Sequence, residues 1–335
     1  MRASTIAFTA WAAVLAAANT AQAADCKPLG LVSSVALEPM DRDDRFTVPV
    51  TIDGHAEHLI VDSGSPFTML SLDAAKRLDL KMRGNLIGSV SVTGKSSNAQ
   101  AIANTFDLGS AHATNFYFFI YAGQLKEGEA GLVSPTSFSQ SDIDFDFGGR
   151  RLNIFSRDHC EGRVIYWPER PLAVIPMDTR SGHLDVPVSV DGHALNAVLD
   201  TGATDTMLID TAAWRIMGIK AGSADAPEIG ASSADPLLKY YSHPFASLSF
   251  GGVNVQNPRI IIMTDRMSDS LHQSTGGGSR IAEPDNTHVP DIIIGMNILK
   301  SLHLYAAYGE KKLYITPAGT SSALDKPAGP ASPAK

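Results

Sequence analysis

The sequence predicts an all-β protein built from two homologous β-barrel lobes that are related by a pseudo-twofold axis. Residues 46–75 align on residues 184–213 without a gap, at an offset of 138, and fourteen of the thirty aligned positions are identical. Within each copy, two β-branched runs flank an Asp-Gly pair, which is the strongest short signal for a β-hairpin. Because the chain holds two copies, each of more than 100 residues, the duplication indicates two lobes and not a solenoid.

The start of the chain has the pattern of a secretory signal peptide over residues 1–23. Arg2 precedes an apolar region at 6–18, and Ala21-Gln22-Ala23 provides a small-x-small cleavage pattern near Ala23. The alternative is a membrane anchor, but a spanning helix needs about 20 strongly apolar residues, and this region is short and rich in Ala. The pattern therefore predicts a periplasmic or extracellular protein without membrane contact after signal removal.

Composition and charge narrow the function classes. The 335 residues are 44% hydrophobic and 19% charged, which is a globular balance. A formal net charge of -8, without a run of five or more Lys and Arg, argues against nucleic acid and anionic membranes as partners. Cys26 and Cys160 are a candidate disulfide from the mature N-terminus to the end of the first lobe, and the sequence leaves this pairing open. Because no Cys or His pair has metal-site spacing, we expect neither a metal nor another cofactor.

Each lobe is expected to consist mostly of strands. For the first lobe, residues 24–156, the expected elements are strands at 48–52, 55–61, 106–108 and 116–121, a helix at 73–78 and a projecting hairpin at 89–102. For the second lobe, residues 172–316, they are strands at 186–190, 193–199, 229–232, 248–250 and 259–263 and a helix at 211–217. The remaining segments are a connector at 157–171, a polar insertion at 264–290 and a disordered tail at 317–335.

Each lobe also carries one aspartate at the end of an apolar strand, Asp62 in the first and Asp200 in the second. A carboxylate at the end of a buried strand is costly unless other groups hold it there. Gly64 and Gly202 follow two residues later, and their backbone freedom leaves main-chain N–H groups able to face the carboxylates. The repeated arrangement therefore indicates that the two aspartates have a functional role and are not ordinary turn residues.

A hydroxyl residue follows each aspartate and can lock the loop by hydrogen bonding to the facing backbone; these are Ser63 and Thr201. Related lobes pack about a pseudo-twofold axis, and equivalent loops near that axis bring the two aspartates face to face. Two carboxyl groups that lie so near to each other share a proton, and their pKa values move apart. The ionised one can then take a proton from a water that attacks a carbonyl, while the protonated one donates to the carbonyl oxygen.

The second-lobe loop, residues 198–208, resembles the active-site loop of retroviral-type aspartic proteases, and Asp62-Ser63-Gly64-Ser65 is similar to the pepsin-like form. These families support each loop with an apolar-apolar-Gly element. Ile293-Ile294-Gly295 matches it, and Glu129-Ala130-Gly131 is the expected first-lobe equivalent. The resemblance implies two retropepsin-like lobes, a cleft covered by hairpin flaps, and a catalytic pair of aspartates. The residues expected to carry the site are Asp62, Ser63, Gly64, Ser65, Asp200, Thr201, Gly202 and Ala203.

The resemblance also suggests where a peptide substrate is bound. Thr204 stands where retroviral-type enzymes often carry an acidic residue that contacts the substrate backbone, and Asp205 follows it. Thr93 and Gly94 in the first lobe and Gly230 in the second lobe are flap candidates by position. An ordinary solvent-exposed hairpin fits the flap candidates equally well.

The residues after the two glycines differ, Ser65 in the first loop and Ala203 in the second. A hydroxyl at Ser65 could hydrogen-bond the nearby carboxylate and favour its charged form, which Ala203 cannot do. The difference predicts that Asp62 is more often ionised and that Asp200 holds the proton.

Together these features predict an exported aspartic endopeptidase that acts on peptides or proteins. The alternative is a peptide-binding protein of the same fold with lost or vestigial catalysis, which Glu129-Ala130-Gly131 and the unusual Ser63-Gly64-Ser65-Pro66 favour. A scaffold with two turn-type loops is disfavoured, because folding does not require the same carboxylate twice. Since both lobes lie in one chain, we expect a monomer.

Overall fold

The computed structural model describes residues 26–41, 43–90, 96–123, 125, 128–138, 140–167, 173–180, 182–233, 235–266 and 289–319, and the side chains of these except 85–90 and 96. Several sequence-based predictions fall outside the described residues. They are the signal peptide at 1–23, the flap candidates Thr93 and Gly94, most of the insertion at 264–290 and the tail beyond residue 319.

The first lobe is an eight-stranded sheet with the order β2-β3-β4-β9-β5-β8-β7-β6, in which an added β3–β7 pairing folds the sheet back on itself. A helix, α1 (Leu72–Arg77), follows β5. The strands are β2 (Glu38–Pro39), β3 (Phe46–Ile52), β4 (His55–Val61), β5 (Met69–Ser71), β6 (Lys81–Val90), β7 (Ser96–Leu108), β8 (Ala111–Tyr121) and β9 (Gly131–Val133).

The second lobe is a nine-stranded sheet with the order β16-β17-β20-β15-β21-β14-β13-β18-β19. The described residues of this lobe include the helices α2 (Asp210–Met217) and α4 (Met296–Leu299). The strands are β13 (Asp185–Val190), β14 (His193–Leu199), β15 (Thr206–Ile209), β16 (Glu228–Ala231), β17 (Lys239–Ser242), β18 (Ser247–Phe250), β19 (Val253–Gln256), β20 (Ile260–Met263) and β21 (Ile292–Ile294).

The duplication seen in the sequence is repeated in the strand pairing. The parallel pair β4–β9 has its counterpart in β14–β21, and the parallel pair β5–β8 has its counterpart in β15–β20. The hairpin turns agree as well, because Asp53 and Asp191 have φ of 47° and 48°, and the glycines after them have φ of 82° and 83°. Two successive residues with positive φ form the turn type that joins tight β-hairpins, and Asp-Gly tolerates it.

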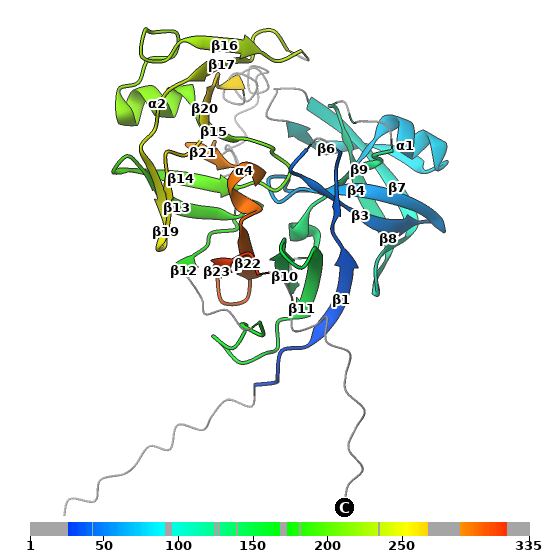
Figure 1. Cartoon of the computed structure of the whole chain (residues 1–335). Helices are drawn as coiled ribbons and strands as arrows, with labels where there is room; N and C mark the ends of the chain where they lie inside the picture. Colours follow the sequence, from blue (N-terminus) through cyan, green and yellow to red (C-terminus); the bar gives the residue numbers. More distant parts are fainter. Residues whose placement is uncertain are drawn as a thin grey trace, which may run out of the picture.

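A third sheet joins the lobes below the two aspartate loops (Figure 1). Its order is β1-β11-β10-β22-β23-β12, so each half of the chain supplies three strands, and β10 pairs antiparallel with β22 across the junction. The strands are β1 (Leu31–Ala36), β10 (Ser141–Asp146), β11 (Arg151–Ser156), β12 (Ala173–Pro176), β22 (Leu302–Ala307) and β23 (Lys312–Pro317).

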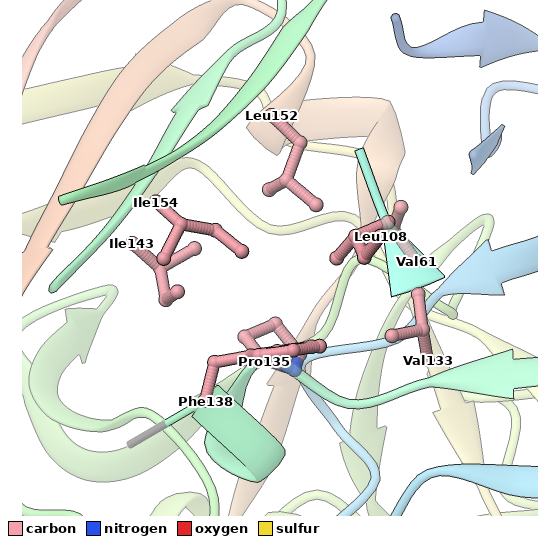
Figure 2. A pocket seen from close by; sticks show the side chains of 8 residues that line it. All are labelled: Val61, Leu108, Val133, Pro135, Phe138, Ile143, Leu152 and Ile154. Carbon is pink, nitrogen blue, oxygen red and sulfur yellow. The ribbon is translucent and has the colours of Figure 1, made fainter. Parts of the chain in front are cut away.

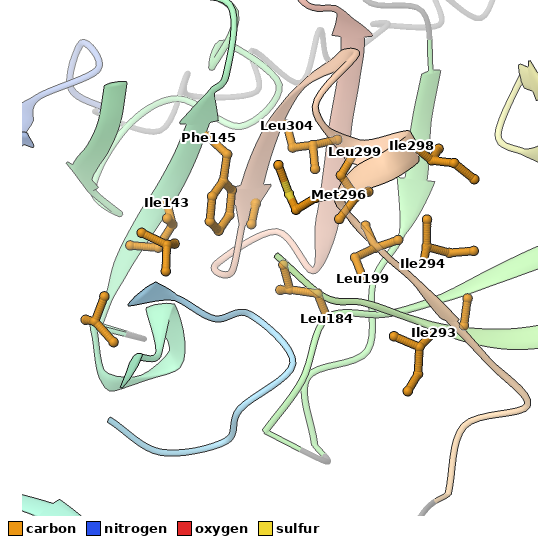
Figure 3. Close-up of a cluster of buried hydrophobic side chains, with 14 of the residues drawn as sticks. Ile143, Phe145, Leu184, Leu199, Ile293, Ile294, Met296, Ile298, Leu299 and Leu304 are labelled. Atoms are coloured by element: carbon orange, nitrogen blue, oxygen red, sulfur yellow. The ribbon is translucent and has the colours of Figure 1, made fainter. Parts of the chain in front are cut away.

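The main apolar core runs from one lobe to the other. Figure 3 shows Phe145 of β10 facing Met296 of α4 and Leu304 of β22, with Leu199 of β14 close by. On the first-lobe side, Val61, Val133 and Ile154 belong to an apolar seam that leaves no room for a water molecule (Figure 2). Close packing of this kind fixes the sheet that carries each aspartate relative to the sheet between the lobes.

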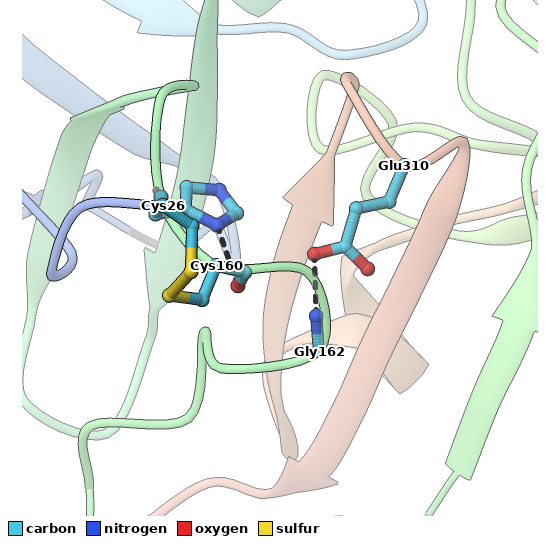
Figure 4. The surroundings of a disulfide bond; sticks show 5 residues. Cys26, Cys160, Gly162 and Glu310 are labelled. Carbon is cyan, nitrogen blue, oxygen red and sulfur yellow. Dashed lines mark hydrogen bonds between the residues drawn. A yellow bond between two sulfur atoms is a disulfide. The ribbon is translucent and has the colours of Figure 1, made fainter. Parts of the chain in front are cut away.

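The ends of the described chain are tied to the central sheet. A disulfide joins Cys26 to Cys160 with 4.7 Å between the Cα atoms, which confirms the pairing that the sequence left open (Figure 4). Strand β23 extends to Pro317, and the backbone N–H of Ala318 donates to the carbonyl of Ser301 at 2.9 Å. The predicted tail at 317–335 thus begins with ordered residues, because Pro317 still pairs with β22. Within the described part of the chain, no helix is long and apolar enough to span a membrane.

Candidate active site

Asp62 and Asp200 each follow a strand that is buried in the middle of a lobe. The backbone N–H of Asp62 donates to the carbonyl of Val133 at 3.0 Å, and that of Asp200 donates to the carbonyl of Ile294 at 2.9 Å. Each aspartate is therefore anchored by the parallel neighbour of its own strand, β9 or β21. The equivalent bonds place both side chains at equivalent points of the two lobes.

Ser63 and Thr201 connect the two loops by four reciprocal hydrogen bonds. The hydroxyl of Ser63 donates to the carbonyl of Leu199 at 2.6 Å, and the hydroxyl of Thr201 donates to the carbonyl of Val61 at 2.7 Å. Each hydroxyl also accepts the backbone N–H of the other residue at 3.0 Å. Because all four bonds are buried and cross between the lobes, they hold the aspartates in register.

The two carboxyl groups are hydrogen-bonded to one another, and each lies over the glycine of the opposite loop. A Cβ added at Gly64 would lie 2.5 Å from both carboxyl oxygens of Asp200, and one added at Gly202 would lie 2.5 Å from Cγ of Asp62. A residue with a side chain would push the carboxyl groups apart. This close approach explains why glycine occupies both positions.

The surroundings of the pair assign the shared proton to Asp62. Burial raises the pKa of Asp62 well above its ordinary value, and the charge of Asp200 and the hydrogen bond with it raise it further. Burial also raises the pKa of Asp200, but this carboxylate accepts the N–H groups of Gly202 at 2.8 Å and Ala203 at 3.1 Å. The N–H of Gly64 and the charge of Arg45 also lower the pKa of Asp62, but by less than burial and the charge of Asp200 raise it, so we assign the negative charge to Asp200.

The prediction that Ser65 favours the charged form of Asp62 is therefore wrong. The hydroxyl of Ser65 donates to the carbonyl of Phe67 at 2.7 Å and does not reach a carboxyl group. Ala203 contributes what a side chain was expected to supply, because its backbone N–H donates to Asp200. Backbone N–H donors, and not the hydroxyl of Ser65, determine which of the two carboxyl groups is ionised.

The support element of the first lobe is also corrected by the strand register. Ile60 of β4 pairs with Leu132 of β9, as Val198 of β14 pairs with Ile293 of β21. The first-lobe equivalent of Ile293-Ile294-Gly295 is consequently Leu132-Val133-Ser134, and not Glu129-Ala130-Gly131 as the sequence suggested. Both apolar positions are kept and buried, and a serine replaces the glycine.

Ser134 makes the same backbone hydrogen bond as the glycine of the second lobe, and its side chain makes a further one. Its backbone N–H donates to the hydroxyl of Thr68 at 3.0 Å, and the N–H of Gly295 donates to the equivalent hydroxyl of Thr206 at 3.1 Å. The hydroxyl of Ser134 also donates to the carbonyl of Ser65 at 2.5 Å. The first-lobe loop is thus held by its support element.

Thr204 contacts Asp43, a residue that belongs to none of the sequence motifs described above. Its hydroxyl donates to Asp43 at 3.0 Å, and Asp43 forms an ion pair with Arg45 at 2.7 Å. Burial opposes ionisation of Asp43, but the hydrogen bonds and charge of Arg45 hold its pKa below the usual range. Arg45 in turn donates to the carbonyl of Gly202 at 3.2 Å, so a first-lobe cation is attached to the second-lobe loop.

The other predicted substrate contacts among the described residues, Asp205 and Gly230, lie in the second lobe. Asp205 lies 3.5 Å from Arg259 as an exposed ion pair, and Gly230 is exposed on β16, the edge strand of the second-lobe sheet. Position 67, the first-lobe equivalent of Asp205 at the offset of 138, is Phe67, whose ring stacks on Phe119 at 3.9 Å. The two sides of the site therefore differ in polarity.

An apolar cluster lies beside Asp62 on the face of the first-lobe sheet opposite to the main core. Its buried members are Ile60, Met69, Phe119 and Leu132, with Met40, Phe67, Tyr121 and Leu125 partly buried against them. Burial raises the pKa of the Tyr121 phenol, and the charges of Asp62 and Asp200 raise it too, which places Tyr121 within electrostatic reach of the pair. Among the described residues, no group of three His, Cys, Asp or Glu could hold a metal ion.

Two β lobes with equivalent parallel strand pairs, each presenting an aspartate over the other's glycine, define a bilobal acid-protease fold. The model of the aspartyl protease family matches residues 48–133 and again residues 186–298, so the chain belongs to the aspartyl protease family. A search of curated proteins finds no match.

Solved structures of similar proteins include an aspartic proteinase from Irpex lacteus and Basic 7S globulin from soybean. The first is 12% identical with a TM-score of 0.47, and the match covers 89% of this chain and 100% of that one. The second is 11% identical with a TM-score of 0.45, and the match covers 88% of this chain and 96% of that one.

Proposed function

We propose that this protein is an exported aspartic endopeptidase that hydrolyses peptide bonds with a water activated between Asp62 and Asp200. The observation that carries the proposal is the hydrogen-bonded pair of carboxyl groups, held in register by the reciprocal bonds of Ser63 and Thr201. An unneeded pair of buried carboxyl groups would be costly to keep. Their placement fits a site where one acid and one base act together.

The asymmetry of the pair assigns the steps. Ionised Asp200 accepts a proton from the water as its oxygen bonds to the carbonyl carbon, and protonated Asp62 donates its proton to the carbonyl oxygen. The resulting diol collapses when Asp200 returns its proton to the amide nitrogen. The C–N bond then breaks, and Asp62 regains a proton from the diol as the new carboxyl group forms.

The alternative of a peptide-binding protein without catalysis loses its main support. It depended on a degraded support element in the first lobe, whereas Leu132-Val133-Ser134 keeps the apolar residues and the hydrogen bond to Thr68. The unusual Ser63-Gly64-Ser65-Pro66 loop also retains its function, because Ser63 makes the same bonds as Thr201. No described feature separates the two loops into a working and a vestigial one.

The substrate that fits this site is a peptide with an apolar side chain next to the scissile bond. The apolar cluster around Phe67 and Phe119 provides a surface for such a side chain on the first-lobe side, while Asp205 and Arg259 make the second-lobe side polar. The disulfide of Cys26 and Cys160 supports export, because disulfides persist in oxidising compartments. One chain supplies both aspartates, so a monomer is sufficient.

The test is cleavage of a diverse peptide library by the wild type and by Asp62→Asn and Asp200→Asn. Removal of either member of an acid–base pair should lower kcat by at least about 100-fold. Asp225→Asn is the matched control, since Asp225 is exposed and its carboxylate bonds no described residue. A statine-type inhibitor should bind the wild type and abolish cleavage. Equal cleavage by all variants would overturn the proposal, and tight inhibitor binding without cleavage would favour the peptide-binding alternative.

A further inference from the structure

A polar cavity of about 380 Å³ lies where the two lobes meet the central sheet. Pro66 and Thr136 border it from the first lobe, and Thr179 and Gly182 border it from the second lobe. This cavity is separate from the aspartate pair, although Pro66 follows the first active-site loop directly. It is therefore a second candidate site, which the proposed endopeptidase reaction does not use.

Arg157, which follows β11, supplies the positive charge of the cavity. Its guanidinium lies over the ring of Tyr308 at 5.6 Å, and its Nε lies 3.8 Å from Asp142. At this distance the two groups form an ion pair but not a hydrogen bond. Nε of Arg157 and the hydroxyl of Tyr308 are buried without a hydrogen-bond partner among the described residues. Unsatisfied buried donors are rare in native proteins, and a bound ligand is one reason for them.

Asp142 does not neutralise Arg157 completely, because the same carboxylate is shared with His159. Nε2 of His159 lies 2.6 Å from Asp142, and Nδ1 lies 3.1 Å from the carbonyl of Cys160. Both ring nitrogens face acceptors, an arrangement that only the imidazolium satisfies. Burial lowers the pKa of His159, but the bonds to Asp142 and Cys160 raise it by more. Asp142 is thus shared by two cations, and Arg157 is the charged side chain among the residues that line the cavity.

We propose that the cavity binds a small carboxylate, with the Arg157 guanidinium as its principal contact. The planar guanidinium matches a carboxylate with two parallel hydrogen bonds. The hydroxyl of Thr179 and the side-chain amide of Gln140 on the wall can complete the hydrogen bonding. Arg157 is the one charged residue among the described residues that line the cavity, so a singly charged carboxylate matches the lining better than a phosphate, which carries more charge.

Occupancy of the cavity should brace the two lobes against each other. The ligand would touch Pro66, four residues after Asp62, and Gly182, which precedes the His183 whose charge acts on Asp200. Gly182 already approaches the first lobe closely, since a Cβ added there would lie 2.8 Å from Cβ of Pro66. A ligand that binds only the folded, closed arrangement stabilises it by mass action.

The carboxylate has two possible sources, a free organic acid or the C-terminus of a peptide. The experiment measures binding to the full chain by titration calorimetry and thermal unfolding, with acetate, acetyl-dialanine and acetyl-dialanine amide as probes. The Asp62→Asn variant serves in the peptide arms, so that cleavage cannot disturb them. We expect saturable binding of the two acids and none of the amide. Tighter binding of the peptide acid identifies a peptide terminus, and equal binding identifies a free acid.

Substitutions at Arg157 test whether the acids bind in this cavity. Arg157→Gln should weaken acid binding at least tenfold, and Arg157→Lys, which keeps the charge but not the fork, should weaken it less. Arg163→Gln is the control, because Arg163 is exposed and outside the cavity. If Arg157→Gln does not fold, the lysine variant and the series of probes still test whether Arg157 binds the carboxylate. Absence of saturable binding, equal binding of the amide, tighter binding of inorganic phosphate, or an effect of Arg163→Gln as large as that of Arg157→Gln would each overturn the proposal.

Discussion

Ser134 occupies in the first lobe the position that Gly295 occupies in the second lobe. Their backbone N–H groups donate to equivalent threonine hydroxyls, Thr68 at 3.0 Å and Thr206 at 3.1 Å. A Cβ at Gly295 would overlap the carbonyl oxygen of Asp205, whereas the first lobe accommodates the serine side chain and gives it a bond to Ser65. The lobes thus solve the same loop-support problem with different residues.

This relationship predicts unequal effects of alanine at the two positions. Ser134→Ala removes the hydroxyl that donates to Ser65 and should lower the free energy of unfolding by about 1 to 2 kcal/mol. Gly295→Ala forces a side chain into the backbone of Asp205 and should lower it by about 3 kcal/mol. Urea unfolding measures both. An equal or reversed order would contradict the assigned equivalence.

The reciprocal bonds between the loops predict that removing them lowers both kcat and the free energy of unfolding. Thr201→Val keeps the volume but removes the bonds to Val61 and to Ser63, which should cost about 2 kcal/mol of stability. A displacement of the aspartates of about 1 Å is expected to lower kcat about 100-fold. Thr201→Ser keeps the hydroxyl and serves as the control. A valine variant with wild-type kcat would show that these bonds do not position the pair.

The pH dependence of activity should not respond to Ser65. Since its hydroxyl bonds the carbonyl of Phe67, Ser65→Ala should leave the acid limb of the kcat/KM profile where it is. Activity should rise with pH as Asp200 ionises and fall as Asp62 loses its proton, and the raised pKa of Asp62 should place the falling limb well above the ordinary range of an aspartate. An acid limb that moves upward in Ser65→Ala would restore the hydroxyl as the cause of the asymmetry.

The pairing of His159 with Asp142 predicts a stability that declines with rising pH. The pKa of His159 is raised above 6.5 in the folded state, so the folded protein binds this proton more tightly than the unfolded chain. Its contribution is complete below 6.5 and is lost as pH rises through the folded pKa. His159→Gln should lower the free energy of unfolding by about 3 kcal/mol in the acidic range, and by less in the basic range. Denaturant titrations at both pH values check this; a constant difference would contradict it.

The sequence was sufficient for the features that depend on local pattern. The gapless repeat predicted the hairpins at Asp53 and Asp191, the strands that follow them and the pairing of Asp62 with Asp200, because hairpin turns and buried strands have short-range signals. The family assignment rested on the same residues. These features repeat at a fixed offset, which made each copy a check of the other.

The remaining features depend on register and on packing between distant segments. The support element was sought by its glycine, so Ser134 was overlooked and Glu129-Ala130-Gly131 was selected, although strand pairing starts at Gly131. The bond from Arg45 to Gly202 and the bond from Thr204 to Asp43 form only when the lobes pack together. No spacing in the sequence encodes such a contact.

The central sheet has a consequence for how this architecture can be divided. Each half of the chain contributes three neighbouring strands to it, and within this sheet the halves meet where β10 pairs antiparallel with β22. A first half produced alone would expose β10 as an open edge, on which Asp144 and Asp146 have lost His303. Two identical first halves would bring these aspartates together without a basic partner, so β10 is complementary to β22 and not to itself. The duplicated halves have therefore become unlike at the strands that join them, which makes each half the specific partner of the other.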